Sequence, residues 1–134
     1  MTRIFSGLLS AAAAATVVMI ACSKSPTGPQ PGTLSIKLQS PNSGADGAIL
    51  FTLSSPVPVT NVQASAGDTL WSTDFSGTST KIVLTGAISS GVILRFDVPD
   101  VNQFDQYIVS VNQVASSADY SLRSLTNYVA FSSK

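Results

Sequence analysis

Residues 92–98 read VILRFDV, and this stretch decides the fold because apolar and polar side chains alternate along it. Alternation with a period of two is typical of a β-strand that buries one face. We expect four side chains to point into a core: Val92, Leu94, Phe96 and Val98. The other three should point outward: Ile93, Arg95 and Asp97. Pro99 ends the stretch, since proline cannot donate to a ladder of strands.

Similar patterns lie on both sides of this strand. Leu34, Ile36 and Leu38 alternate with polar residues, and Ile49, Phe51 and Leu53 share a face, with Leu50 on the opposite one. Further short strands are predicted near residues 81–86, 107–114 and 127–133. Between them lie turn-forming stretches such as 41–47 (PNSGADG). About seven to nine short strands with frequent turns predict an all-β fold, an antiparallel β-sandwich.

Two stretches fit this pattern less well. Val59 and Val62 cannot lie on the same face of a regular strand, which predicts a bulge or bend between them. Residues 116–128 (SSADYSLRSLTNY) lack a clear period, and we expect mostly loop there.

The N-terminal residues have the order of a secretory signal. Arg3 precedes an uncharged, mainly apolar stretch from Ile4 to Ala21, and the single cysteine of the chain, Cys22, follows directly. A basic start, an apolar middle and a small residue before the cut are the parts of such a signal. We therefore expect three regions: a signal peptide at 1–21, Cys22 with a linker to residue 32, and a β-sandwich domain at 33–134.

Met19-Ile20-Ala21-Cys22 resembles the lipobox of bacterial lipoproteins. The resemblance implies cleavage before Cys22, acylation of its thiol and attachment to a lipid bilayer of the cell envelope. Ser23 after the cysteine favours the outer membrane if the source has two membranes. The alternatives from the residues alone are a buried, inert thiol or a free thiol in an uncleaved anchor.

Residues 23–32 contain three prolines, two glycines and no apolar side chain suited to a core. Proline-rich segments favour an extended conformation of about 3.1 Å per residue, so this linker would reach roughly 30 Å.

The order of the strands also resembles the cohesin-like β-sandwich family, which is built as a jelly roll and is close to carbohydrate-binding sandwiches. An immunoglobulin-like sandwich is the alternative. The resemblance rests on five stretches: 47–56 (GAILFTLSSP), 59–70 (VTNVQASAGDTL), 71–75 (WSTDF), 81–86 (KIVLTG) and 91–98 (GVILRFDV).

Composition excludes several functions. Seven basic and seven acidic residues balance, which gives no basic surface for nucleic acid. The chain has no histidine and no glutamate, and no cofactor is indicated. Zinc would need His or Cys ligands. Calcium prefers oxygen ligands, but the eligible residues occur singly in turns, where we expect solvated side chains: Asp46, Asp68, Asp74, Asp100, Asp105 and Asp119.

A hydrolase would need paired carboxylates or an activated nucleophile. The pair closest in sequence is Asp97 and Asp100, on either side of Pro99. A turn in which an Asp accepts backbone hydrogen bonds is the simpler interpretation.

Candidate binding residues cluster around the single tryptophan. Trp71 and Phe75 lie close together, with Asp68 and Asp74 beside them. Large aromatic side chains in sandwiches usually belong to the core, so we expect both rings to be buried. Leu70 and Trp71 should point to opposite faces, and the alternative is an exposed Trp71 that stacks on a sugar ring.

In the stretch 116–128, Tyr120 and Arg123 are candidates for a contact surface. The sequence as a whole predicts a lipid-anchored, non-catalytic module that binds a protein or glycan partner. A structural envelope protein without a ligand and a small Asp-dependent hydrolase are the alternatives.

Overall fold

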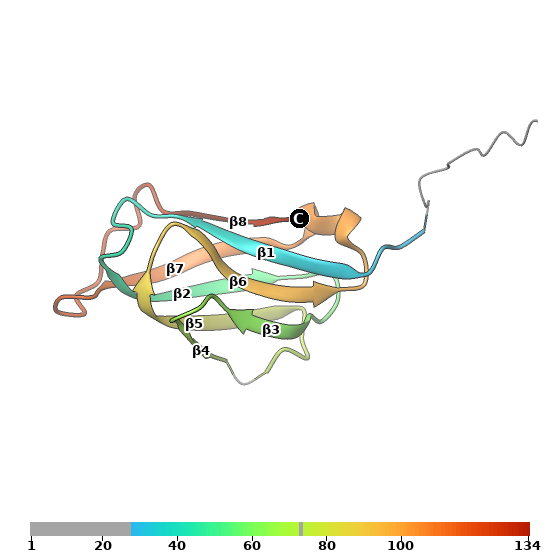
Figure 1. Cartoon of the computed structure of the whole chain (residues 1–134), viewed down its shortest axis with the longest axis horizontal. Coiled ribbons are helices and arrows are strands. Elements are labelled where there is room, and N and C mark those ends of the chain that lie inside the picture. Colours follow the sequence, from blue (N-terminus) through green and yellow to red (C-terminus); the bar gives the residue numbers. More distant parts are fainter. Residues whose placement is uncertain (1–27, 73) are drawn as a thin grey trace, which may run out of the picture.

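The computed structural model describes residues 28–72 and 74–134, so Cys22 and the predicted signal peptide lie outside the described residues. The described chain forms two four-stranded antiparallel sheets in two layers (Figure 1). This confirms the predicted all-β class. In chain order the elements are β1 (Gly32–Gln39), β2 (Asp46–Ser54), β3 (Thr60–Ala64), β4 (Thr69–Trp71), β5 (Ser79–Ile88), β6 (Gly91–Val98), the 3₁₀ helix η1 (Val101–Gln106), β7 (Ile108–Ser116) and β8 (Val129–Ser133).

The strands pair in nested order, from the first and last strands of the domain to the two in the middle. One sheet has the order β3-β6-β1-β8 and the other β4-β5-β2-β7. The first strand therefore pairs with the eighth, the second with the seventh, the third with the sixth and the fourth with the fifth. Two further pairs, β1 with β6 and β2 with β5, join these into four-stranded sheets.

The core lies between the sheets and contains the side chains that the alternation selects. From the first sheet, Leu34, Ile36 and Phe96 have no exposed surface, and from the second the same holds for Ile49 and Phe51. Burial of such a side chain contributes about 1.5–3 kcal/mol, so these strands are stabilised mainly by packing. The ring of Phe96 lies 5.7 Å from that of Tyr107, centre to centre.

Strand β6 departs from the predicted alternation at its first two apolar residues, Val92 and Ile93. Ile36 pairs with Leu94 and Lys37 with Val92, so Ile93 has no partner on β1. This bulge turns Ile93 into the core, where it is 1% exposed. Val92, opposite the exposed Lys37, lies on the outer face and is not part of the core. The predictions that Ile93 points outward and that Val92 points inward are therefore both wrong.

The two irregular regions follow the prediction more closely. In β3 the register shifts between Thr60 and Gln63, and Asn61 has a φ of 49°, which confirms a bulge before Val62. Residues 117–128 form a loop, here called the far loop, with one isolated bridge between Ala115 and Leu122. The short helix η1 was not predicted.

The strands define two ends of the molecule. At one end β1 begins and β6 ends, next to η1; we call it the tether end because the chain enters the domain there (Figure 1). The far loop and the turn at 40–45 lie at the opposite, far end (Figure 1). No helix among residues 28–72 and 74–134 has the length and apolar character needed to cross a bilayer.

Candidate functional site

Trp71 ends the edge strand β4 and lies on the outer face of its sheet. Its side chain is 60% exposed, so the prediction of a core tryptophan is wrong. The expected opposition holds, because the neighbouring Leu70 packs against the core. The indole Nε1 donates a hydrogen bond of 2.9 Å to Thr85 Oγ1 on β5, which fixes the orientation of the ring. The register sets the two faces, because Leu70 is opposite the buried Leu84 and Trp71 is opposite the half-buried Val83.

The strand register aligns Trp71 with two apolar neighbours. Trp71 is opposite Val83 on β5, and Val83 is opposite Leu50 on β2. Both aliphatic side chains are only half-buried. Because side chains of paired residues lie on the same face of a sheet, these three form a row across β4, β5 and β2. We call this row, with Leu122 at its far side, the Trp71 face.

Two hollows lie along the Trp71 face. The larger, of about 580 Å³, is lined by Trp71, Ser72, Asp74, Ser79 and Lys81, among others. The smaller, of about 200 Å³, lies between Leu50, Val83 and Leu122. Leu122 is 68% exposed, and the bridge between its residue and Ala115 holds it against the edge of β7. The face thus combines apolar contact area with groups that form hydrogen bonds.

Asp74 is fixed beside the larger hollow by its own turn. Its Oδ1 accepts hydrogen bonds from the backbone N–H of Ser76 (2.8 Å) and from the Ser76 hydroxyl (2.5 Å). These bonds, to the hydroxyl first and the amide second, lower the pKa of the Asp74 carboxyl below its usual value. Asp74 therefore presents a carboxylate at neutral pH.

Phe75 and Asp68 do not line this hollow. Phe75 is half-buried and packs against the core, which supports the core interpretation for this ring. Asp68 lies against the backbone of Gly86, where burial raises the pKa of its carboxyl. Of Trp71 and the three residues predicted around it, the structure therefore brings only Trp71 and Asp74 into one hollow.

The two candidate residues of the far loop, Tyr120 and Arg123, lie in different environments. Tyr120 is 72% exposed and has a φ of 56°, a conformation that is uncommon for a residue other than glycine. Arg123 does not belong to a free contact surface, because its Nε forms an ion pair of 2.6 Å with Asp46 Oδ1. Its Nη2 also donates to the carbonyl oxygen of Ala45, at 2.9 Å.

Asp46 is the residue that the sequence interpretation placed wrongly. It was expected to be a solvated turn residue, but it starts β2 and is 0% exposed. The Tyr128 hydroxyl contacts both of its oxygens, at 2.9 and 3.0 Å, and Ser40 Oγ donates to Oδ2 at 2.6 Å. A lone Asp before a glycine looks like a turn. One signal for this pair was available in the sequence, because charged residues are rare. Arg123 is the only basic residue between Arg95 and Lys134, which makes it a candidate partner for a carboxylate.

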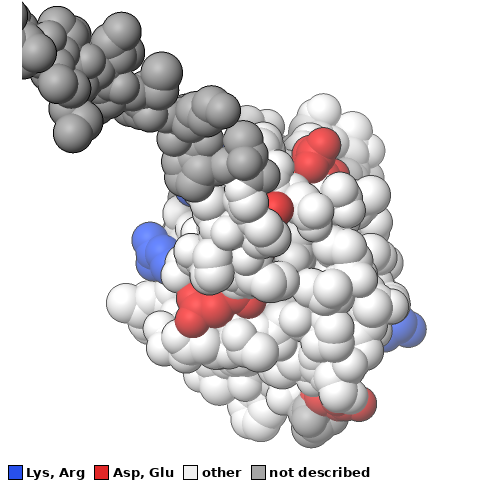
Figure 2. Space-filling view, turned by 90° about the vertical axis from the view of Figure 1, so that its right-hand side faces the viewer, with Lys and Arg blue, Asp and Glu red and all other residues white. Residues whose placement is uncertain are grey.

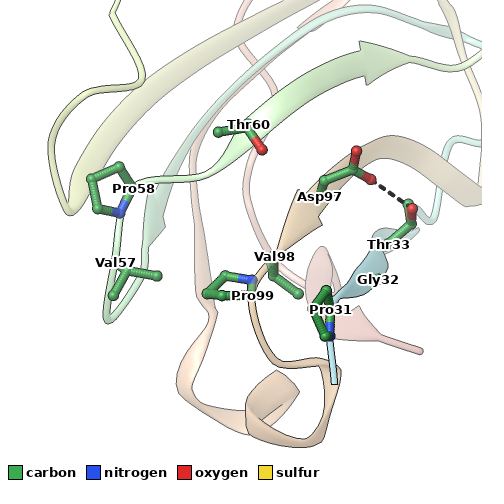
Figure 3. A pocket seen from close by; sticks show the side chains of 9 residues that line it. All are labelled: Pro31, Gly32, Thr33, Val57, Pro58, Thr60, Asp97, Val98 and Pro99. Atoms are coloured by element: carbon green, nitrogen blue, oxygen red, sulfur yellow. Dashed lines mark hydrogen bonds between the residues drawn. The ribbon is translucent and has the colours of Figure 1, made fainter. Parts of the chain in front are cut away.

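A third concave surface lies at the tether end, between the start of β1 and the end of β6. This groove, of about 810 Å³, has Pro31, Val98 and Pro99 on one side and Val57 and Pro58 on the other (Figure 3). Thr33 Oγ1 donates to Asp97 Oδ1 at 2.6 Å within it (Figure 3). The surface at this end shows small, separate charged patches on a mostly uncharged background (Figure 2).

The carboxylates of Asp97 and Asp100 each have structural partners. Asp97 also accepts from Asn61 Nδ2, and its bonds to Thr33 and Asn61, in that order of size, lower the pKa of its carboxyl. Asp100 Oδ1 accepts from the backbone N–H of Asn102 (3.0 Å) and of Gln30 (3.2 Å). Asp100 therefore caps η1 and holds the last residues of the linker.

No group of three or more His, Cys, Asp or Glu side chains with the geometry of a metal site occurs in the part of the chain that the structure describes. No family model, curated protein or solved structure matches this chain.

Proposed function

We propose that this chain is a lipid-anchored, extracytoplasmic binding module that presents the Trp71 face to a protein or glycan partner without catalysis. The observation that carries the binding role is the exposure of Trp71 in register with Val83 and Leu50. An exposed tryptophan in contact with further apolar side chains is the composition typical of interaction surfaces.

Attachment through Cys22 is supported by the order of residues 1–32. A basic start, an apolar stretch, a small residue, one cysteine and a proline-rich segment follow one another. Several acyl chains, each contributing about 0.8 kcal/mol per buried CH₂, would hold the protein firmly to a bilayer. The proposed location is the bacterial cell envelope, on the outer membrane where two membranes exist.

The far end would then point away from the bilayer. The linker meets the domain at Gly32, and β1 runs from there toward the far loop. The hydrogen bonds of Gln30 with Asp100 and Val101 shorten the free part of the linker by a few residues relative to the expectation. The Trp71 face runs along the side of the domain between the two ends, where a partner at the cell surface has access.

For the fold we propose a cohesin-like jelly roll. Jelly rolls are double-sheet folds of eight strands. The nested pairing of β1 with β8, β2 with β7, β3 with β6 and β4 with β5 supports this assignment. An immunoglobulin-like sandwich would place the first strand beside the second. In this chain β1 pairs with β6 and β8.

The non-catalytic role is supported by what the candidate carboxylates do. A general acid or base must reach its substrate within hydrogen-bond distance. Asp97 and Asp100 are engaged with Thr33, Asn61, Gln30 and Asn102 instead. Arg123, the cation of the far loop, is paired with Asp46.

Two measurements on the full chain test the proposal. Intact mass of the protein expressed in a bacterium should show a chain that begins at Cys22 and carries acyl groups, and Cys22→Ser should abolish the modification. A native chain that still begins at Met1 and carries no acyl group would overturn the anchor.

The binding role is tested by passing a bacterial envelope extract over the immobilised native chain and over its Phe131→Ala and Trp71→Ala variants. The native chain and Phe131→Ala should retain a component of the extract that Trp71→Ala does not retain. Phe131 is a matched control because it is a 41% exposed aromatic residue on the other sheet. Equal retention by all three forms would contradict binding through the Trp71 face.

A further inference from the structure

We propose that the ligand of the Trp71 face is a neutral oligosaccharide or polysaccharide chain, with one sugar ring stacked on Trp71 in the larger hollow. This inference rests on the proposed binding role and names the chemical class of the partner.

The indole ring suits a sugar because its polar atom is already engaged. The Nε1–H donates to Thr85 Oγ1, so the hydrogen-bonding requirement of the ring is met within the protein. What remains for a ligand is the apolar ring surface, at 60% exposure of the side chain. An aromatic face is electron-rich and attracts the C–H groups on the flat side of a pyranose.

The groups around the ring match the hydroxyls at the rim of the same sugar. Asp74 is held by Ser76 through Oδ1, which leaves the lone pairs of Oδ2 for ligand hydroxyls. Lys81, on the adjacent strand, supplies an ammonium donor. Ser79 lines the hollow with a hydroxyl that donates and accepts. The Ser72 hydroxyl, which donates to the carbonyl oxygen of Lys81 at 3.2 Å, offers its lone pairs. A volume of about 580 Å³ lies in the range of small-molecule sites.

The charges favour a neutral ligand. Asp74 and Lys81 line the same hollow and carry opposite charge, so neither an acidic nor a basic chain gains a net attraction there. The remainder of the row, Val83 and Leu50, is apolar. A protein partner would use the same tryptophan, but the groups of this hollow fit a ligand that offers a hydroxyl at nearly every carbon.

The length of the face favours a chain over a single sugar. Neighbouring strands lie about 4.8 Å apart, so the row from Trp71 through Val83 to Leu50 covers about 10 Å. The smaller hollow at Leu122 continues beyond it. Further rings of a chain would therefore contact Val83, Leu50 and Leu122 in succession.

The test uses the single tryptophan of the chain as its own probe. The full chain, in a detergent without a sugar headgroup, is titrated with cellohexaose, xylohexaose, chitohexaose and maltohexaose while the emission of Trp71 is recorded. At least one of them should shift the emission saturably at millimolar concentration or below. Hexagalacturonate, an anionic probe of similar length, should bind at least about tenfold more weakly, a difference of about 1.4 kcal/mol.

Calorimetry with the best hexasaccharide then compares variants. Trp71→Ala should weaken binding by about tenfold or more and Asp74→Ala by a smaller factor, while Trp71→Phe retains part of the affinity. Phe131→Ala should change it by less than about twofold. Because Trp71 is exposed, Trp71→Ala should keep the native thermal midpoint, which separates lost binding from lost folding.

The outcomes distinguish the two proposals. If none of the neutral hexasaccharides changes the emission, or if Trp71→Ala binds as tightly as the native chain, the glycan inference is overturned. If an envelope protein shifts the emission of Trp71 and the sugars do not, the glycan inference fails and the binding module remains. If neither does, both proposals fail.

Discussion

The two ends of the domain both use aspartate to fix a segment that is distant in sequence, but they do so in opposite environments. At the far end, Asp46 is completely buried and binds Arg123 and Tyr128 of the far loop. At the tether end, Asp100 binds the amides of Gln30 and Asn102 where solvent has access.

The difference concerns how strongly each end depends on its carboxylate. A buried charge without its partner is costly, so the far end tolerates no loss at Asp46. A solvent-accessible carboxylate that accepts amide hydrogen bonds can be replaced in part by water. We therefore expect the far loop to be fixed as firmly as the core, and the entry of the linker to be the weaker attachment.

The largest effect is predicted for Asp46→Ala. This change leaves Arg123, whose side chain is only 24% exposed, without its carboxylate and removes an acceptor of the Tyr128 hydroxyl. Breaking a buried pair by removing one partner costs about 3 kcal/mol or more. Urea unfolding should show this loss of stability, and hydrogen exchange should show faster exchange of the Arg123 amide, which donates to Val114.

Asp119→Ala in the same loop is the matched control for that change. Asp119 is exposed and accepts only from nearby residues of its own turn, such as Ser121. It should lower the unfolding free energy far less than Asp46→Ala. Similar losses for the two variants would contradict the distinction between buried and exposed carboxylates.

Asp100→Ala should have a smaller effect at the tether end. It removes the cap of η1 and the acceptor of the Gln30 amide. Loss of a capping side chain costs about 1 kcal/mol. The amides of Gln30 and Asn102 should exchange faster while that of Arg123 is unchanged. A general increase in exchange would show that the two ends are not independent.

Thr33→Val tests the neighbouring Asp97 through its pH dependence. The Thr33 hydroxyl lowers the pKa of Asp97, so this bond stabilises the fold above the unfolded pKa of about 3.9 and loses its effect as the pH falls through the lower folded pKa. The variant should raise the pKa of Asp97, measured by NMR titration. It should lose stability at pH 6 and little at pH 2. Thr33→Ser, which keeps the hydroxyl, should behave like the native chain.

The smallest effect, with the opposite sign, is expected for Asp68→Asn, on the turn between β3 and β4. Burial raises the pKa of Asp68, so its charged form disfavours the fold above an unfolded pKa of about 3.9, and protonation relieves this as the pH falls. The amide should slightly increase the thermal midpoint at pH 7 and lose the advantage near pH 3. A lower thermal midpoint at pH 7 would show that the charged carboxylate of Asp68 stabilises the fold, and would contradict this prediction.

Prediction from sequence succeeded where a single strand decides the outcome. The inward positions of β1 and β2, and those of β6 from Leu94 to Val98, follow from alternation, since every second side chain shares a face. Prediction failed at Val92 and Ile93, because a bulge depends on the register with β1. It failed at Trp71, because the burial of a short edge strand depends on what covers it. It also failed for the pair of Asp46 and Arg123, which are 77 residues apart in the chain.

The sequence by itself determined the all-β class, most core positions and the turns, because these depend on the local period of apolar residues and on the conformations that proline and glycine allow. Only the tertiary structure decided which strands pair, which aspartate is buried and which aromatic ring meets solvent. Those outcomes depend on contacts between segments that are distant in the chain, where packing and the cost of burying an unpaired charge select the partner.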